Sequence, residues 1–293
     1  MSFHEFLHVL WHGTHDTLRL LPFLFLTYLL MEILEHKAGD RTRGMIARAG
    51  RLGPLFGALL GLVPQCGFSA VAAGLFAARI VTPGTVLAVF LATSDEMLPV
   101  LLGAGIPLPR VLAILAIKLV IAALCGFATD LLLHRYIQAP HVEEFCDEEH
   151  CHCEQGVWRS ALHHTWQIGL FVLVVNLVLS FVLEFVGTEA LASLVGGIPV
   201  LGESVAALVG LVPNCAASVA IATLYTNGVI SGGVMLSGLL TGAGAGLLVL
   251  FRTNRHLVQN LLFVLALFLL GVLFGVLFGS VLELSGFLGL FAL

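Results

Sequence analysis

Two carboxylates, Asp95 and Glu96, lie inside the apolar segment "LATSDEMLP" at residues 91–99. Acidic side chains are costly in an apolar environment and are kept there mainly to bind cations or protons. Ser94 precedes them and adds a hydroxyl oxygen, and Lys118 lies in the next apolar run. An ion pair between Lys118 and one acid is the structural interpretation. The functional interpretation is that the acids bind a cation or a proton and that Lys118 releases them when a substrate arrives.

The phrase "GLVPQCGFSA" at residues 61–70 returns as "GLVPNCAASV" at residues 210–219. Each proline interrupts a helix because it lacks a backbone N–H, and nearby carbonyl groups are left free. Thiol ligands favour soft ions, whereas amide and carbonyl oxygens favour hard ones. Two alternatives stay open: the prolines could be packing kinks, and the cysteines could be small hydrophobic residues. The candidate ligands in the two phrases are Gln65, Cys66, Ser69, Asn214, Cys215 and Ser218.

A third group of candidate ligands lies in the segment "HVEEFCDEEHCHCE", residues 141–154. His150, Cys151, His152 and Cys153 offer imidazole and thiolate donors of the kind that bind metal ions, beside several carboxylates. Their spacing matches no zinc-finger template. A metal-collecting or metal-sensing tether and a solvated acidic linker are therefore both open interpretations.

These candidates must be positioned by membrane helices. The 293-residue chain is 59% hydrophobic and 11% charged, whereas about a quarter of a soluble protein's residues are charged. The net charge of −5 is concentrated in the acidic segment and argues against nucleic-acid binding. We therefore predict an all-α polytopic membrane protein. The apolar runs long enough to cross about 30 Å of hydrocarbon are 18–34, 85–102, 111–133, 168–185, 234–251 and 257–281.

The chain contains an ungapped internal repeat at an offset of 149 residues. Residues 61–64 fall on residues 210–213, Cys66 falls on Cys215, and Ser69 falls on Ser218. A match that includes proline and cysteine is not expected by chance among Leu-, Gly- and Ala-rich helices. We divide the chain into a first repeat (1–140), an acidic His/Cys-rich loop (141–156) and a second repeat (157–293), with about five helical segments in each repeat.

Lysine and arginine predict the orientation of the two halves, because short basic loops stay in the cytosol. The loop after the first apolar run is basic, whereas its counterpart, residues 186–200, contains no Lys or Arg. One loop is therefore inside where its counterpart is outside, and the repeats are predicted to be inverted. Both chain ends would then face the periplasm or exterior, and the 141–156 loop the cytosol. Arg19 and Arg110 would lie outside, against ten basic residues inside: Lys37, Arg41, Arg43, Arg48, Arg51, Arg79, Arg135, Arg159, Arg252 and Arg255.

The inverted repeat suggests a role for the two helix breaks at the proline phrases. Residues 52–63 and 67–80 are each too short to span a bilayer comfortably, and Pro64-Gln65-Cys66 separates them, as Pro213-Asn214-Cys215 does in the second half. Broken helices at matching positions of inverted halves point to the substrate site of a transporter. Re-entrant hairpins and pairs of short spans are both compatible with the sequence.

The segments "GLVPQCGFSA", "LATSDEMLP" and "GLVPNCA" resemble those of the ten-span heavy-metal exporters, a family also catalogued as manganese transporters or arsenic efflux permeases. The resemblance covers essentially the whole chain. It implies efflux of a metal or metalloid across the bacterial inner membrane. The residues that match the motifs are Gln65, Cys66, Ser94, Asp95, Glu96, Asn214 and Cys215.

We therefore expect a multi-pass secondary transporter, not an enzyme, that exports a divalent metal cation, with Mn²⁺ favoured. The sequence contains no phosphate-binding P-loop, which favours an ion gradient as the energy source and proton coupling through the acids. No cofactor is expected beyond the transported ion. The expected partners are the lipid bilayer and the metal ion, with a homodimer as a further option. The predicted metal ligands of the pathway are Asp95, Glu96, Cys66 and Cys215.

Three alternatives remain at this stage. The first is a permease for arsenic or another metalloid, including organoarsenicals, in which Cys66 and Cys215 dominate binding. The second is an intramembrane enzyme acting on a lipid headgroup, with Ser94 and Lys118 as its nearest reactive groups. The third is a metal sensor that uses the 141–156 loop without transport.

Overall fold

The computed structural model describes residues 11, 14–15, 17–18, 20–22, 24–26, 28–29, 52–65, 67–94, 97–133, 157–186 and 200–279. Every regular element in these residues is helical, which confirms the predicted all-α class. Several predicted site residues lie outside the described part: Cys66, Asp95, Glu96, His150, Cys151, His152 and Cys153, together with the whole 141–156 loop.

Five helices recur in the same order in each half. Subtracting 149 from the first residues of α11 to α15 gives 52, 66, 83, 96 and 108, against 53, 67, 83, 97 and 108 for α3 to α7. The first set is α3 (Gly53–Gly61), α4 (Gly67–Ala77), α5 (Pro83–Ala92), α6 (Met97–Gly103) and α7 (Leu108–Leu132). The second set is α11 (Leu201–Gly210), α12 (Cys215–Thr226), α13 (Gly232–Thr241), α14 (Ala245–Thr253) and α15 (Leu257–Leu277).

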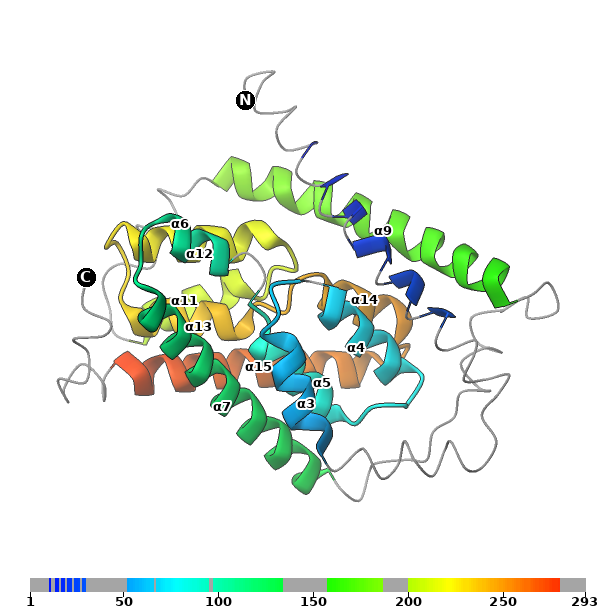
Figure 1. The fold of residues 1–293 in the computed structure, drawn as a ribbon, viewed down its shortest axis with the longest axis horizontal. Coiled ribbons are helices and arrows are strands. Elements are labelled where there is room, and N and C mark those ends of the chain that lie inside the picture. Colours follow the sequence, from blue (N-terminus) through cyan, green and yellow to red (C-terminus); the bar gives the residue numbers. More distant parts are fainter. Residues whose placement is uncertain are drawn as a thin grey trace.

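Five helical stretches of the described residues are long and apolar enough to cross a membrane, which agrees with a polytopic protein. Helix α9 (Val157–Val186) provides one of them and lies along one edge of the molecule, away from α7 and α15 (Figure 1). The short helices of both halves lie on the side of α9 that faces α7 and α15 (Figure 1). The stretches are 83–103, 108–132, 161–179, 232–253 and 257–277.

The predicted interruptions at the two proline phrases are confirmed, and a second pair of interruptions accompanies them. Helix α3 ends before Pro64 and α11 ends before Pro213. The predicted continuous spans 85–102 and 234–251 are also broken, between α5 and α6 and between α13 and α14. At the first of these breaks Thr93 leaves the helical conformation, with φ −48° and ψ 125°. At the second, Gly244 has φ 55° and ψ −145°, a conformation that favours glycine.

Helices α3 and α4 form a hairpin. The start of α3 and the end of α4 both lie near the start of α5. A Cβ on Gly53 would meet Thr85, whereas a Cβ on Gly61 would meet Val89 and Ala92, so α3 and α5 run parallel. Because α4 ends six residues before α5 begins, it must return from the break to the end at which α3 started. The same parallel packing joins α11 to α13, where Ser237 Oγ donates to Glu203 O at 2.8 Å and Thr241 Oγ1 to Ala207 O at 2.9 Å.

Helices α5 and α7 pack closely and run antiparallel. A Cβ on Gly84 would clash with the backbone oxygen of Gly126, and one on Gly126 would lie 2.6 Å from the oxygen of Gly84. The counterparts repeat this contact, since a Cβ on Gly233 would lie 2.6 Å from Gly275 O. Glycine pairs of this kind let membrane helices approach through their backbones.

Across the two halves, α4 packs against α14 and α6 packs against α12. The first contact is tight: a Cβ on Gly246 would lie 2.7 Å from Ser69 Cβ and 2.8 Å from Phe90 Cε1. Gly238, eight residues before Gly246, is also closely packed, because a Cβ there would meet Ile221. Gly242, the residue between them in the same spacing, has only ordinary contacts and lies instead at the break after α13.

The carboxylate of Asp130 anchors the start of α5. Asp130 Oδ1 accepts from Gly84 N at 2.8 Å, and Oδ2 accepts from Thr82 Oγ1 at 2.6 Å.

Replacing Asp130 with alanine is expected to destabilise the protein by about 1–3 kcal/mol, because the first-turn N–H of α5 loses its acceptor. Asp130→Asn keeps one acceptor oxygen and should lose clearly less. Thermal midpoints of the two purified variants measure the difference, and equal midpoints would contradict the anchoring role.

Candidate functional site

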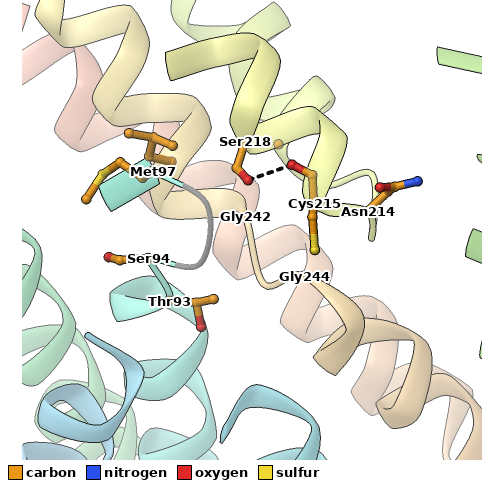
Figure 2. Close-up of a pocket in the computed structure, with 10 residues that line it drawn as sticks. Thr93, Ser94, Met97, Asn214, Cys215, Ser218, Gly242 and Gly244 are labelled. Carbon is orange, nitrogen blue, oxygen red and sulfur yellow. Dashed lines mark hydrogen bonds between the residues drawn. The ribbon is translucent and has the colours of Figure 1, made fainter. Parts of the chain in front are cut away.

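A small pocket lies where three of the helix breaks converge (Figure 2). Its walls come from the α5–α6 break, from the α11–α12 break and from the α13–α14 break. The cavity volume is about 10 Å³, which is close to the space that one water molecule needs. The residues that line it are Thr93, Ser94, Met97, Gly210, Asn214, Cys215, Ser218, Leu239, Gly242 and Gly244.

The polar groups of the pocket are held by hydrogen bonds to their own helix ends. Thr93 Oγ1 donates to Val89 O at 2.8 Å, and Ser94 Oγ donates to Ala92 O at 2.8 Å. Ser218 Oγ donates to Cys215 O at 2.8 Å, the bond drawn in Figure 2. A hydroxyl that donates in this way keeps its oxygen lone pairs available to a cation.

Cys215 and Asn214 form the start of α12. Asn214 Oδ1 accepts from Ala216 N at 2.9 Å and so caps the helix. Its amide points away from Ser94 in Figure 2, and Asn214 Nδ2 donates to the backbone oxygen of Asn176 in α9 at 3.3 Å. The Cys215 side chain is 8% exposed, and its sulfur points to the side on which Gly244 lies (Figure 2).

Lys118 reaches the same region from α7. Its side chain is fully buried, and its Nζ donates to the backbone oxygen of Thr93 and, at 3.0 Å, to that of Leu239. Both acceptors belong to residues that line the pocket. The ammonium group therefore joins the end of α5 to the last turn of α13, one helix from each half.

Asn176 is a buried polar residue of α9 beside Asn214. It is 6% exposed, and its Oδ1 accepts no hydrogen bond within the described residues. Asp130 differs from it in this respect: the structure provides two donors for the Asp130 carboxylate, whereas the described part of the chain provides none for the Asn176 oxygen.

The structure brings four of the sequence-predicted residues together around the pocket: Ser94, Asn214, Cys215 and Ser218. Lys118 lies beside them through its bonds to the pocket backbone. Ser69 is placed elsewhere, because it is buried in the contact between α4 and α14. Gln65 lies in the α3–α4 break and is not among the lining residues.

Several lining residues were missed by the sequence reasoning because they lie at the second pair of breaks. Thr93 and Gly242 are counterparts at the 149-residue offset. Thr93 follows the last residue of α5, and Gly242 follows the last residue of α13; each of these helices is the first half of an interrupted span and is called a half-helix below. Two signals marked these breaks: Pro99, two residues inside α6, and the Gly242–Gly244 sequence "GAG". Both signals stand within apolar runs of full membrane length, where hydropathy indicates an uninterrupted span.

Among the described residues, no three His, Cys, Asp or Glu side chains gather in a way that could hold a metal ion. The pocket provides hydroxyl, amide and carbonyl oxygens and one thiol. Oxygen donors of this kind suit hard cations, and a thiol suits softer ions.

Comparison with known protein families gives a match over more than half of the chain. Residues 17–193 match a family model described as "Putative, 10TM heavy-metal exporter". The match extends across the 141–156 loop into the second half and includes α3 to α7 and α9. Neither the curated proteins nor the solved structures contain a match. Because the matched segment is more than half of the 293 residues, the chain belongs to this family of ten-transmembrane heavy-metal exporters.

Proposed function

We propose that the protein is a secondary active transporter that exports a divalent metal cation, with Mn²⁺ favoured, across the bacterial inner membrane. The observation that carries the proposal is the pocket at three converging helix breaks, which has room for about one water-sized guest. Its wall includes Ser94 and Met97, the two residues that flank Asp95 and Glu96 in the sequence. A small, oxygen-lined cavity next to two acids in the sequence suits a monatomic hard cation.

The proposal includes two inverted repeats, and the packing of α4 on α14 supports them. Ser69 near the start of α4 contacts Gly246 near the start of α14. The rings of Phe76 near the end of α4 and of Phe263 in α15, the helix that follows α14, lie 5.1 Å apart. The first contact joins the two helix starts and favours an α4 and an α14 that run side by side in the same direction. Because α4 runs back along α5, and α6 continues the apolar stretch that α5 begins, α14 would then run opposite to its counterpart α6. Together with the basic-loop pattern, this favours halves of opposite orientation.

The same arrangement favours hairpins that enter and leave the membrane on one side, because α3 ends beside Val89 and Ala92, level with the end of α5 and about halfway along the apolar stretch 83–103. Non-helical backbone at membrane depth is tolerated where it is buried in protein or lines a cavity, and the Asn214 region does line one. In this topology both chain ends face the periplasm and the 141–156 loop faces the cytosol. The metal ligands of that loop would then collect the ion on the side from which it is exported.

Proton coupling follows from the same carboxylates, since a bound cation and a bound proton compete for them. Replacing Asp95 with asparagine and Glu96 with glutamine is expected to lower Mn²⁺ flux in proteoliposomes by at least about tenfold each, the equivalent of about 1.4 kcal/mol of lost binding. Flux is measured with an indicator trapped inside the vesicles under an imposed pH gradient.

The matched control for this experiment is Asp130→Asn. It removes one charge from the same half but lies at the far end of α5, where the acid serves as a helix anchor. Its flux should stay within about twofold of the unmodified protein. Undiminished flux in both Asp95→Asn and Glu96→Gln would refute the cation site.

A metalloid substrate is the second candidate, because the Cys215 thiol is part of the pocket wall. Thiolates bind soft ions such as trivalent arsenic in preference to hard cations. The test is a double variant with Cys66→Ser and Cys215→Ser. If the substrate is a metalloid, this variant no longer transports it. If the substrate is the divalent cation, the Mn²⁺ flux of this variant mostly survives. Measuring arsenite and Mn²⁺ flux on one preparation therefore separates the two functions.

A further inference from the structure

The two acceptors of Lys118 are carbonyl groups at the C-terminal ends of half-helices. Thr93 directly follows the last residue of α5, and Leu239 lies in the last turn of α13. In α13 the N–H of Ala243 donates to Thr241 O at 2.9 Å, so it does not complete the regular i to i−4 bond to Leu239 O. The ammonium of Lys118 donates to this carbonyl at 3.0 Å.

Two helix C-termini that face each other form a place for positive charge. Each C-terminus carries the equivalent of roughly half a negative elementary charge, so two of them are balanced by one monovalent cation. In membrane transporters, the C-terminal ends of half-helices and unwound carbonyls commonly coordinate Na⁺ or protons. Here the position is filled by the protein's own ammonium group, and the Lys118 side chain is fully buried.

The second half has no cation at the corresponding position. The counterpart of Lys118 at the 149-residue offset is Leu267, which is fully buried in the hydrophobic core. One ammonium therefore serves the half-helix ends of both halves, Thr93 in the first and Leu239 in the second.

We propose that Lys118 is a built-in monovalent cation at an alkali-ion site formed by the ends of α5 and α13. The native protein consequently needs no bound Na⁺ or K⁺ at this position. When the side chain is shortened and the space is left open, Na⁺ or K⁺ binds to the same carbonyl groups.

The test compares Lys118→Ala, which opens the space, with Lys118→Met, which fills it with an uncharged chain of similar length. Thermal midpoints of the purified variants are measured in NaCl, KCl and N-methyl-D-glucamine chloride at equal ionic strength. Lys118→Ala should gain about 5 °C in saturating Na⁺ or K⁺ relative to the bulky cation. The unmodified protein and Lys118→Met should show no such difference.

Three results overturn the proposal. The first is a Lys118→Ala midpoint that is the same in all three salts. The second is an equal gain in Lys118→Met or in the unmodified protein, because the ion would then act elsewhere. The third is failure of Lys118→Ala to accumulate as folded protein in cells, since cytosolic K⁺ should be able to replace the ammonium. No transport is measured, so these results are independent of the proposed metal export.

Discussion

Replacing Gly84 with alanine is expected to lower the thermal midpoint of the purified protein by about 5 °C or more. In an ordinary helix the same change stabilises by about 1 kcal/mol, because alanine is the better helix former. Here the new Cβ would clash with the backbone oxygen of Gly126, and a backbone atom cannot rotate away as a side chain can. The sign of the effect is therefore reversed. A thermal-shift or size-exclusion stability assay in detergent measures it.

Gly103→Ala is the matched control, because a Cβ at this helical position would meet nothing within 4 Å. It should leave the midpoint within about 2 °C of the unmodified protein. Gly233→Ala, the counterpart of Gly84, should be harmful as well, since its Cβ would lie 2.6 Å from Gly275 O. If Gly84→Ala and Gly103→Ala behave alike, the close backbone contact between α5 and α7 does not exist.

The second large effect is expected from moving the buried lysine between the halves. Lys118→Leu should lower the midpoint by about 5 °C or more, because two buried carbonyl groups lose their donor. Leu267→Lys should be at least as harmful, since it adds a second buried ammonium to a core position. The double variant moves the single charge to the counterpart position, and it should recover at least half of the loss seen in Lys118→Leu.

Thermal midpoints of the two single variants and the double variant form a double-mutant cycle. Two independent sites give losses of stability that add. A double variant that loses less stability than the sum of the two single losses is therefore the signature of a cation position shared by residues 118 and 267. A double variant that is as unstable as the sum of the two changes would contradict the pairing of these positions by the repeat. Because Leu267→Lys is also measured alone, general intolerance of charge at that position is detected separately.

Much of the fold could be predicted because the repeat signal is carried by residue types with strong local effects. Pro64 and Pro213 predicted that helices end before them, and α3 and α11 do end at Gly61 and Gly210. The offset of 149 predicted where the second set of helices begins. These inferences depend on backbone chemistry and length, which a sequence displays directly.

The second pair of breaks could not be predicted from hydropathy, because residues 83–103 and 232–253 are continuous apolar stretches. Their interruption depends on tertiary partners: Thr93 is not helical, and its carbonyl accepts from Lys118, a residue of another helix. A single sequence does not reveal which buried donor reaches which carbonyl. The choice between re-entrant hairpins and pairs of short spans was left open for a similar reason, since only the packing of Gly61 on Val89 and Ala92 places the turn after α3 level with the end of α5.

The candidate site was predicted in part. Asn214, Cys215 and Ser218 were selected because they follow a helix-breaking proline, and they do line the pocket. Ser69 was selected by the same rule, yet it is buried against Gly246. The repeat makes the two positions equivalent in sequence, but the neighbours differ: Phe90 fills the space near Ser69, whereas Leu239 and Met97 leave room near Ser218.

Lys118 has a consequence for the origin of the two-part chain. If two copies of the first half assembled with each other, two ammonium groups would compete for one pair of helix ends and would repel each other at short range. If two copies of the second half assembled, leucine would occupy both positions and neither helix end would have a cation. One first half combined with one second half brings a single ammonium group to the two helix ends. Linking the two halves in a single polypeptide fixes the one-to-one ratio that this charge arrangement requires.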